Sequence, residues 1–488
     1  MDSYEISKKE LESVLNSVIN KTLGDVDSKG VFEKVKNHKK VTGIAGDVIE
    51  QSVIGFPANS YQAPDLIVDG EEIEVKTTGI RFSKKSPKKF EAKEPMTITA
   101  VSPETIVNQD FDTSHFWNKL EKLLLIYYHY DSESTVTVSD YADFYIKGFE
   151  IFEFPEEERK ILENDWAIVK DYIANIHKNH DDPEEMYPTL SSALRDQLMF
   201  IDTSPKWPNR PRFRLKRNVV STIVDRYFSN ELEDLDEEIL SFRDFDNKLK
   251  SLTQHYQGMT LDEIVEVLNI DVKKSSNNND YDKAIGEKIV LSMFESSEKK
   301  LSKVKLFEEV GLTVKTIRQT VEGYRTEDTK LMAIEFDEWL DKTLNFEDSS
   351  LHAYFTNPFL FIIFEEPYTK APLSENVFKG FKRVNFSDDF IYNNVECVWN
   401  IVRDLIFNDK LIDEPVTKKS GEQIINKNGI ASTAPNFPKG SEYDIFFRGT
   451  GTDSSKKPLT INNVTMYRQN LWIKGTVINN LLSNHDFI

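Results

Sequence analysis

The stretch Pro64-Asp65-Leu66-Ile67-Val68-Asp69-Gly70-Glu71-Glu72-Ile73-Glu74-Val75-Lys76 decides the fold around it. Asp69-Gly70 lies between two runs rich in strand-forming residues, which is the strongest short-range signal for a hairpin with a two-residue turn. Closing the chain on this turn pairs Val68 with Glu71. The sequence therefore predicts two antiparallel strands whose register is set by the turn.

The same register places Asp65 opposite Glu74, on one face of the strand pair. The Cβ atoms of such a pair lie about 4.5–5.5 Å apart, where two carboxylates repel each other. Lys76 follows Glu74 by two residues and points to the same face. A divalent cation between the carboxylates would remove the repulsion, and Mg²⁺ suits oxygen ligands of this kind. The alternative is a solvated hairpin whose Glu and Lys side chains pair across water.

A helix is expected just upstream, in Lys40–Glu50, because apolar residues recur there at helical spacing and place Glu50 on the flank. Glycines followed by G-x-x-x-E, then P-D, then E-x-K, form an ordered pattern. This order resembles the MutH-type branch of the PD-(D/E)xK nucleases. The resemblance implies a catalytic set of Glu50, Asp65, Glu74 and Lys76.

In that family the first three of these residues serve the metal. The resemblance implies that Asp65 and Glu74 hold Mg²⁺ and that Glu50 completes the shell directly or through water. Lys76 is expected to position the attacking water for in-line hydrolysis of the P–O3′ bond, which leaves a 5′-phosphate.

The resemblance covers nearly all of residues 1–228. Phe116–Lys122 leads into an apolar strand, and Arg212–Asn218 precedes an amphipathic run, as in the middle and the end of a MutH domain. The family places base-contacting residues near this last strand, and Arg or Lys binds guanine in the major groove. The expected DNA contacts are Lys40, Lys84, Lys85, Arg212, Arg214 and Lys216.

The second half of the chain restates the first in order. Five pairs of segments carry the repeat: Thr22–Val26 with Thr260–Ile264, Ile44–Glu50 with Ala284–Val290, Glu72–Thr77 with Gly311–Thr316, Ile146–Phe149 with Phe378–Phe381, and Phe213–Lys216 with Leu471–Lys474. A repeat this long indicates two similar domains rather than a solenoid.

The second copy lacks the acidic residues. The counterparts of Glu50, Asp65, Glu74 and Lys76 are Val290, a position near Val304, Thr313 and Lys315. No carboxylate metal site is expected there. The layout resembles two-lobed restriction endonucleases that cut at GATC, in which a degenerate lobe binds a further copy of the site and activates the first lobe.

The expected fold class is α/β: two tandem PD-(D/E)xK (MutH-like) domains with mixed central sheets flanked by helices. A catalytic domain is predicted over 1–228, an acidic helical linker over 229–258, and a degenerate DNA-binding effector domain over 259–488. The sequence shows neither a long apolar run nor a cleavable signal, so a soluble, cytoplasmic protein is expected. The lone Cys397 excludes an intramolecular disulfide and a cysteine-based metal cluster.

A net charge of −21 argues against a nucleic-acid partner. Charge is unevenly distributed, however, and basic islands at 34–40, 81–89 and 206–217 flank the predicted site or its C-terminal strand.

The function predicted from all of these features is a Mg²⁺-dependent type II restriction endonuclease cutting duplex DNA, with GATC implied by the resemblance. A cognate DNA methyltransferase is the expected genetic partner, and a dimer formed on DNA is an open alternative to a monomer. The other hypotheses are a strand-nicking repair endonuclease and a DNA-binding regulator that does not cut.

Overall fold

The chain forms two compact units, one built mainly from each half of the sequence. The computed structural model describes residues 4–35, 43–56, 64–83, 89–132, 136–204, 210–229, 232–272, 274, 280–282, 285–322, 327–342, 344–418, 420–426, 429–451 and 456–488. The first unit comprises 1–132, 136–251 and 287–313, and the second comprises 252–286 and 314–488. The predicted boundaries at 228 and 258 stay a prediction.

The first unit contains nine described strands and most of the helices of the N-terminal half. Its strands are β1 (Tyr4–Ile6), β2 (Leu66–Val68), β3 (Glu71–Phe82), β4 (Phe90–Ala92), β5 (Met96–Ala100), β6 (Leu123–His129), β7 (Tyr145–Phe152), β8 (Ile201–Asp202) and β9 (Arg212–Leu215). Its helices are α1 (Lys8–Val18), α2 (Leu23–Val26), α3 (Val31–Val35), α4 (Ile44–Val48), the π-helix η1 (Ile49–Ile54), α5 (Pro103–Ile106), η2 (Phe111–Thr113), α6 (His115–Asn118), η3 (Val138–Asp143), α7 (Glu156–Asn179), η4 (Pro183–Thr189), α8 (Leu190–Ala193), α9 (Arg217–Phe228), η5 (Leu301–Lys303) and α13 (Lys305–Glu309).

Three elements run across a boundary between the units: α10 (Phe242–Tyr256), α12 (Ile285–Met293) and β10 (Thr313–Gln319). The second unit adds α11 (Leu261–Val267), β11 (Thr329–Ala333), α14 (Asp337–Leu340), η6 (Phe346–Asp348), α15 (Ser350–Thr356), β12 (Phe359–Glu365), η7 (Leu373–Glu375), β13 (Val377–Val384), α16 (Asp388–Phe390), the π-helix η8 (Ile391–Val395), α17 (Glu396–Phe407), β14 (Asp413–Pro415), β15 (Thr433–Pro435), β16 (Ile445–Thr450), β17 (Leu459–Ile461), β18 (Val464–Met466), β19 (Arg468–Ile473) and α18 (Gly475–Ser483).

The hairpin predicted from Asp69-Gly70 is present as β2 and β3. Asp69 and Gly70 both have positive φ, +50° and +88°, as a type I′ turn requires. The strands pair in the predicted antiparallel register, with Val68 opposite Glu71. The turn chemistry therefore fixes which side chains share a face with Glu74.

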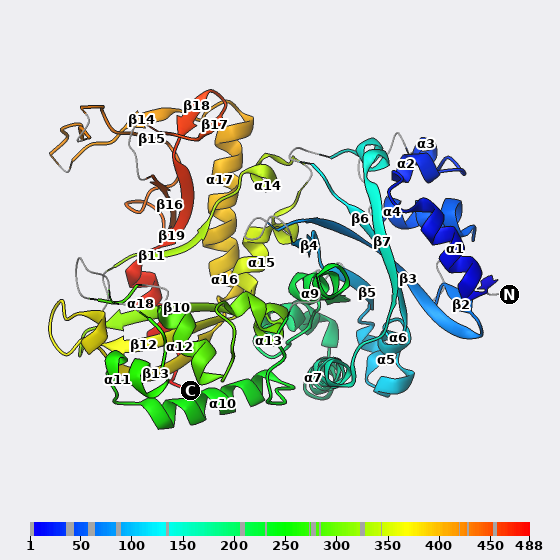
Figure 1. The fold of residues 1–488 in the computed structure, drawn as a ribbon, viewed down its shortest axis with the longest axis horizontal. Helices are drawn as coiled ribbons and strands as arrows, with labels where there is room; N and C mark the ends of the chain where they lie inside the picture. Colours follow the sequence, from blue (N-terminus) through cyan, green and yellow to red (C-terminus); the bar gives the residue numbers. More distant parts are fainter. Residues whose placement is uncertain are drawn as a thin grey trace. The chain divides into compact units, whose positions relative to one another are not determined.

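The main sheet of the first unit is mixed, as predicted. Its order is β1-β2-β3-β6-β7, and β4 also pairs with β3. The central pair β3 and β6 is parallel, whereas β7 runs antiparallel to β6. Figure 1 shows α1, α2 and α4 on one side of β3 and β7, with α9 on the other. Leu15 of α1, Val48 of α4 and Val75 of β3 meet in the core on the first side.

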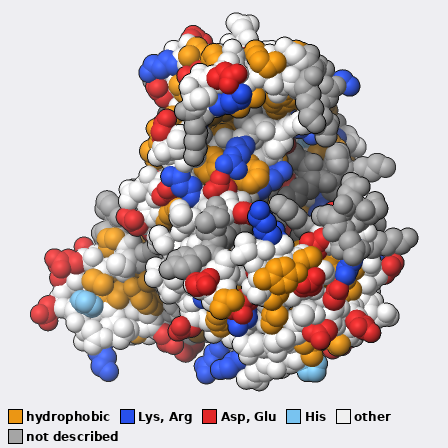
Figure 2. Space-filling view, turned by 90° about the vertical axis from the view of Figure 1, so that its left-hand side faces the viewer, with side chains coloured by type: hydrophobic (Ala, Val, Ile, Leu, Met, Phe, Trp, Pro, Cys, Tyr) orange, Lys and Arg blue, Asp and Glu red, His pale blue; other side chains and the backbone are white. Residues whose placement is uncertain are grey.

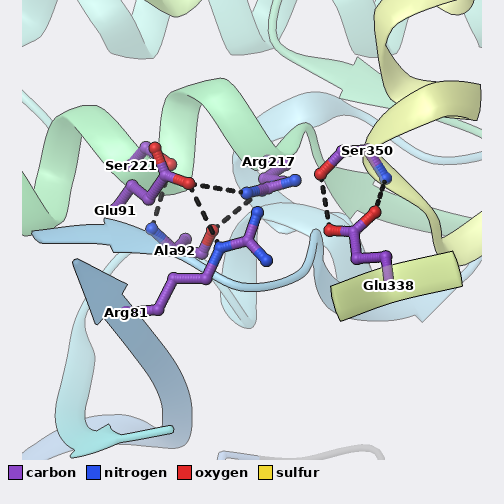
Figure 3. Close-up of polar contacts among 7 residues, drawn as sticks. All are labelled: Arg81, Glu91, Ala92, Arg217, Ser221, Glu338 and Ser350. Atoms are coloured by element: carbon purple, nitrogen blue, oxygen red, sulfur yellow. Dashed lines mark hydrogen bonds and ion pairs between the residues drawn. The ribbon is translucent and has the colours of Figure 1, made fainter. Parts of the chain in front are cut away.

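A second, antiparallel sheet of the first unit has the order β5-β9-β8. Side chains of β3 and α9 fasten the neighbouring strand β4. Figure 3 shows Arg81 and Arg217 converging on Glu91, with N···O distances of 3.2 and 3.0 Å, while Ser221 accepts a hydrogen bond from the Ala92 amide. These contacts fix the far end of β3 to α9, which follows β9 in the chain.

Two strand orders of the first unit recur in the second. The order β10-β12-β13 corresponds to β3-β6-β7, and the order β11-β19-β16 corresponds to β5-β9-β8. The pair β12/β13 even has its irregularity next to Gly380, where β6/β7 has one next to Gly148. On the predicted repeat register these two glycines are counterparts, so the shared bulge supports the repeat.

The acidic stretch after residue 228 leads into α10, which is amphipathic. Phe242, Phe245 and Leu249 of α10 are buried, so the helix packs on its neighbours rather than lying free on the surface. No helix in the described part of the chain is both long and apolar enough to cross a membrane.

Candidate active site

Glu74 lies at the centre of the predicted site and is bound by two lysines. It is only 3% exposed. Its Oε1 lies 2.6 Å from Nζ of Lys76, the residue that the alternation of the strand places on the same face. Its Oε2 lies 2.6 Å from Nζ of Lys119, which follows α6. Burial raises the pKa of Glu74 above its ordinary value, and the two ammonium groups oppose that shift.

The sequence did not indicate Lys119. It becomes a neighbour of Glu74 because β3 and β6 are parallel, and the Glu74 amide donates to the carbonyl of Lys122, just before β6. A parallel pairing between strands so far apart in the sequence has no local signal. The one feature of the sequence that pointed to Lys119 is its place beside the aromatic residues of Phe116–Lys122.

Asp65 is fixed from the opposite strand. The ladder of β2 and β3 ends at Leu66 and Ile73, and beyond it the Asp65 side chain replaces the backbone partner: its Oδ2 accepts a hydrogen bond from the Val75 amide at 3.0 Å. The Asp65 carboxylate raises the pKa of Glu74, as expected for two acids on one face of the hairpin.

Glu50 reaches the same site from η1. The helix widens from α-helical to π-helical at Ile49, and the Gly55 amide donates to the Glu50 carbonyl five residues back. π-turns of this kind occur often at functional sites. Burial raises the pKa of Glu50 to about 7, and the negative charges of Asp65, Asp47 and Glu74 add to the shift. The structure therefore brings together Glu50 of G-x-x-x-E, Asp65 of P-D, and Glu74 and Lys76 of E-x-K.

One further acidic residue near Glu50 escaped the sequence analysis. Asp47 lies one helical turn before Glu50 and adds a fourth negative charge. Gly46, the glycine of the G-x-x-x-E pattern, faces β3: a Cβ at this position would make ordinary contacts, 3.5 Å from Oγ1 of Thr77 and 3.7 Å from Oε1 of Glu50. The start of the helix therefore lies close to the strand that carries Glu74.

The donor set suits a divalent cation, although its oxygens have other partners here. In the described ranges no three His, Cys, Asp or Glu side chains form a group arranged to hold a metal ion. Lys76 and Lys119 engage both oxygens of Glu74, and the Val75 amide engages Asp65. Mg²⁺ usually takes only one or two protein carboxylates and completes its shell with water and phosphate. Mutually repelling, buried carboxylates fit that requirement.

The predicted DNA contacts divide into three groups. Lys40, Lys84 and Lys85 lie outside the described residues. Arg212 is exposed at the start of β9. Arg214 and Lys216 have protein partners, since Arg214 binds Asp202 and Lys216 donates to the Leu198 carbonyl.

Charged side chains of both signs are mixed on the surface. On the face shown in Figure 2, Lys and Arg lie among Asp and Glu. Of the basic islands, Arg81 binds Glu91 and Lys89 binds Asp225 at 3.1 Å. Local pairing therefore accounts for part of the basic charge near the site.

The second repeat lacks the acids at the corresponding place and uses its lysine differently. Thr313 begins β10 where β3 has Glu74 on the repeat register. Nζ of Lys315 donates to the carbonyls of Lys330 and Leu331, each at 3.1 Å. The second unit nevertheless retains the helix–strand approach, because a Cβ on Gly286 would overlap Oγ1 of Thr316, the counterparts of Gly46 and Thr77.

Two comparisons bear on this site. Residues 54–165, which include Asp65, Glu74, Lys76 and Lys119, match the family model of the DNA mismatch repair enzyme MutH. The whole chain is similar to the type II restriction enzyme Sau3AI of Staphylococcus aureus, at 23% identity over 516 residues, with 98% of each chain covered. The predicted resemblance is thus confirmed: the chain is similar to MutH-type nucleases and has the layout of a type II restriction enzyme.

Proposed function

We propose that the protein is a Mg²⁺-dependent type II restriction endonuclease that cuts duplex DNA at GATC. The observation that carries the proposal is the meeting of Asp65, Glu74 and Lys76 with the half-buried Glu50, whose pKa its acidic neighbours help to raise. The similarity to Sau3AI over the full length supports a restriction enzyme. The choice of GATC rests on the two-lobed layout alone.

In this proposal each residue has a separate role. Asp65 and Glu74 would hold Mg²⁺, with Glu50 completing its shell. The bound ion would supply charge neutralisation at the scissile phosphate. Lys76 orients the attacking water and offers positive charge to the reacting phosphate oxygens. Lys119 keeps the buried Glu74 ionised, because its ammonium lies 2.6 Å from a carboxylate that burial disfavours.

The second unit fits a binding role in the same proposal. It shares the strand orders β3-β6-β7 and β5-β9-β8 with the first unit, and the strand β10 that enters it begins with Thr313 in place of Glu74, so it supplies a frame for DNA without the acids for cleavage. We assign it the role of an effector that binds a further site. A cognate DNA methyltransferase would protect the host's own sites.

Nicking of one strand is the second candidate, and the match of residues 54–165 to a mismatch repair enzyme favours it. Supercoiled plasmid separates the two, because a nicking enzyme accumulates open circles and a restriction enzyme goes on to linear DNA. Because the chain is similar to a restriction enzyme over its whole length, linear product is the expected outcome.

The site assignment is tested with Asp65→Ala, Glu74→Ala and Lys76→Ala. Each should abolish cleavage of unmethylated plasmid in Mg²⁺ while gel-shift affinity for DNA survives, because each removes charge from the site without deleting a groove contact. Glu50→Ala should raise the Mg²⁺ concentration needed for cleavage. Thr313→Ala is the matched control in the second repeat and should cut like the wild type. Full activity in Glu74→Ala would rule out the assignment.

A further inference from the structure

The helical turn that carries Glu50 is held from behind by the loop before α3. The hydroxyl of Ser52, two residues after Glu50 in η1, donates to Oδ1 of Asp27 at 2.8 Å and accepts from the Lys29 amide at 3.1 Å. The Ser52 carbonyl accepts a hydrogen bond from the Ser28 hydroxyl at 3.2 Å. Residues two apart in a helix point to nearly opposite sides, so the Ser52 hydroxyl and the Glu50 carboxylate point away from each other.

The carboxylate that holds Ser52 is itself fixed. Oδ1 of Asp27 also accepts from the Val31 amide and Oδ2 accepts from the Phe32 amide, each at 2.9 Å. These are the first two amides of α3, which have no partner within their own helix. Val31 is buried in the core of the first unit, so the loop that contacts η1 is anchored there.

The end of the same turn is held from the sheet. The Tyr4 hydroxyl donates to the carbonyl of Ile54, the last residue of η1, at 2.9 Å. A carbonyl at the end of a helix otherwise lacks a partner within that helix. Tyr4 is paired with Leu66 in the β1/β2 ladder, and Leu66 directly follows Asp65. Tyr4 therefore ties the helix that carries Glu50 to the strand that follows Asp65.

The wide turn is found in the copy that carries the acid. In η1 the Glu50 carbonyl accepts from the Gly55 amide, five residues on, at 2.8 Å. In the second repeat Val290 takes the place of Glu50 within the α-helix α12, and its carbonyl accepts from the Phe294 amide, four residues on, at 3.0 Å. The first is π-helical spacing and the second is ordinary α-helical spacing.

We propose that Ser52 and Tyr4 are positioning residues for Glu50: their hydroxyl groups hold the π-helical turn η1 in the place from which the Glu50 carboxylate completes the Mg²⁺ shell. This inference rests on the proposed function, because it takes Mg²⁺ as the ion of the site. Neither hydroxyl is a ligand in this scheme. Groups that only orient a metal ligand commonly change metal affinity or activity about 10–100-fold when they are removed.

The test follows Mg²⁺ binding to the full chain without DNA or cleavage. Thermal unfolding is measured as MgCl₂ is added, because an ion that binds only the folded protein raises the unfolding temperature as its concentration grows. Asp65→Ala gives the part of the rise that comes from Mg²⁺ bound elsewhere. Ser52→Ala and Tyr4→Phe, which each remove one hydroxyl, should need about tenfold more MgCl₂ than the wild type for the remaining rise.

A double substitution separates positioning from a general loss of structure. In a Glu50→Ala background, Ser52→Ala should leave the MgCl₂ requirement where Glu50→Ala alone puts it, because the turn then has no carboxylate to place. Ser52→Thr keeps the hydroxyl and should stay close to the wild type. In plasmid cleavage, Ser52→Ala should raise the MgCl₂ concentration for half-maximal rate and leave the maximal rate near that of the wild type.

Ser292→Ala is the matched control. Ser292 is the counterpart of Ser52 on the repeat register, and it follows Val290 in α12 rather than an acid. Its replacement should keep the wild-type MgCl₂ requirement. Hydrogen exchange of the Gly55 amide, which donates to the Glu50 carbonyl, should become faster in Ser52→Ala and Tyr4→Phe and stay unchanged in this control.

The outcomes decide the inference whether or not the protein cuts DNA. A wild-type MgCl₂ requirement in Ser52→Ala or in Tyr4→Phe would overturn it, and so would an effect of Ser52→Ala that persists in full on top of Glu50→Ala. A wild type that MgCl₂ stabilises no more than it stabilises Asp65→Ala would overturn it as well. A wild type that binds Mg²⁺ at the site but fails to cut plasmid would instead defeat the proposed function and leave the inference to these titrations.

Discussion

The ammonium group of Lys119 lies as close to Glu74 as that of Lys76 does, and it is the more deeply buried of the two. Lys119→Met should lower the free energy of unfolding by about 1.5–3 kcal/mol, the range for a hydrogen bond to a charged group. It should also lower the rate of cleavage, because Glu74 would then take up a proton more readily. Urea unfolding and plasmid cleavage measure the two effects.

Lys122→Met is the control for that change. Lys122 binds Glu71 and Glu153, whose side chains are 64% and 60% exposed. Exposed pairs contribute only about 0–1 kcal/mol. If both variants lost the same stability and activity, Lys119 would be an ordinary surface cation rather than a partner of the site.

For single residues, the sequence predicts the neighbours that lie close along the chain. The facing of Asp65, Glu74 and Lys76 follows from a two-residue turn and strand alternation, and the structure has that turn and register. Lys119 and Asp202 could not be predicted. The first depends on a parallel pairing between distant strands and the second on a β8/β9 ladder whose strand β8 is only two residues long.

Among the elements, α7 is joined to β8 through one buried carboxylate. Asp165 accepts hydrogen bonds from the amides of Met199, Phe200 and Ile201 at 2.9, 2.7 and 3.1 Å. Burial nevertheless raises its pKa from 3.8 to about 6, against the effect of these amides and of Lys216. The folded protein therefore holds this proton more tightly than the unfolded chain does.

The raised pKa of Asp165 makes the stability of the folded protein depend on pH. Because the folded-state pKa is the higher one, the contribution of Asp165 to stability is largest below about pH 4 and is lost as pH rises through about 6. Relative to Asp165→Asn, which does not titrate, the wild type should lose about 3 kcal/mol over this window. Urea unfolding of both proteins at several pH values measures the difference. A difference that stays constant with pH would contradict the prediction.

Elements with strong local patterns were predicted, and those made by long-range pairing were not. The helix before Glu50, the apolar strand after Lys122 and the strand–helix pair from Arg212 are all present. The π-helical turn of η1 was missed, because one widened turn leaves the spacing of apolar residues almost unchanged. The separate sheet β5-β9-β8 was also missed, since its strands come from distant parts of the unit.

For the whole molecule, the repeat was the most informative prediction available from sequence. The shared bulge beside Gly148 and Gly380 and the shared glycine–threonine approach are features that a chance similarity of segments would not produce. The sequence could not foresee that residues 287–313, assigned to the second repeat, pack within the first unit. The chain therefore passes three times between the units, at 251/252, 286/287 and 313/314, which gives the second a covalent route to influence the first.

A single active centre cannot cut both strands at once, so a double-strand break needs successive nicks or a second molecule. Suppose that the second unit binds another copy of the target more tightly when the first unit is in its cleavage-competent state. Binding of that copy then raises the population of the competent state, by an amount set by the difference in affinity for the target between the two states. Plasmids with two GATC sites should then be cut faster than plasmids with one.

An added duplex gives the sharper measurement. Uncleavable duplex carrying GATC should speed cutting of the one-site plasmid at low concentration and slow it at high concentration, where the duplex also occupies the catalytic unit. Duplex without the site is the control and should do neither. Glu74→Ala should bind the added duplex but remain inactive, because occupation of the second unit adds no chemistry. Equal rates on both plasmids, together with inhibition by the duplex at every concentration, would leave the second unit without a regulatory role.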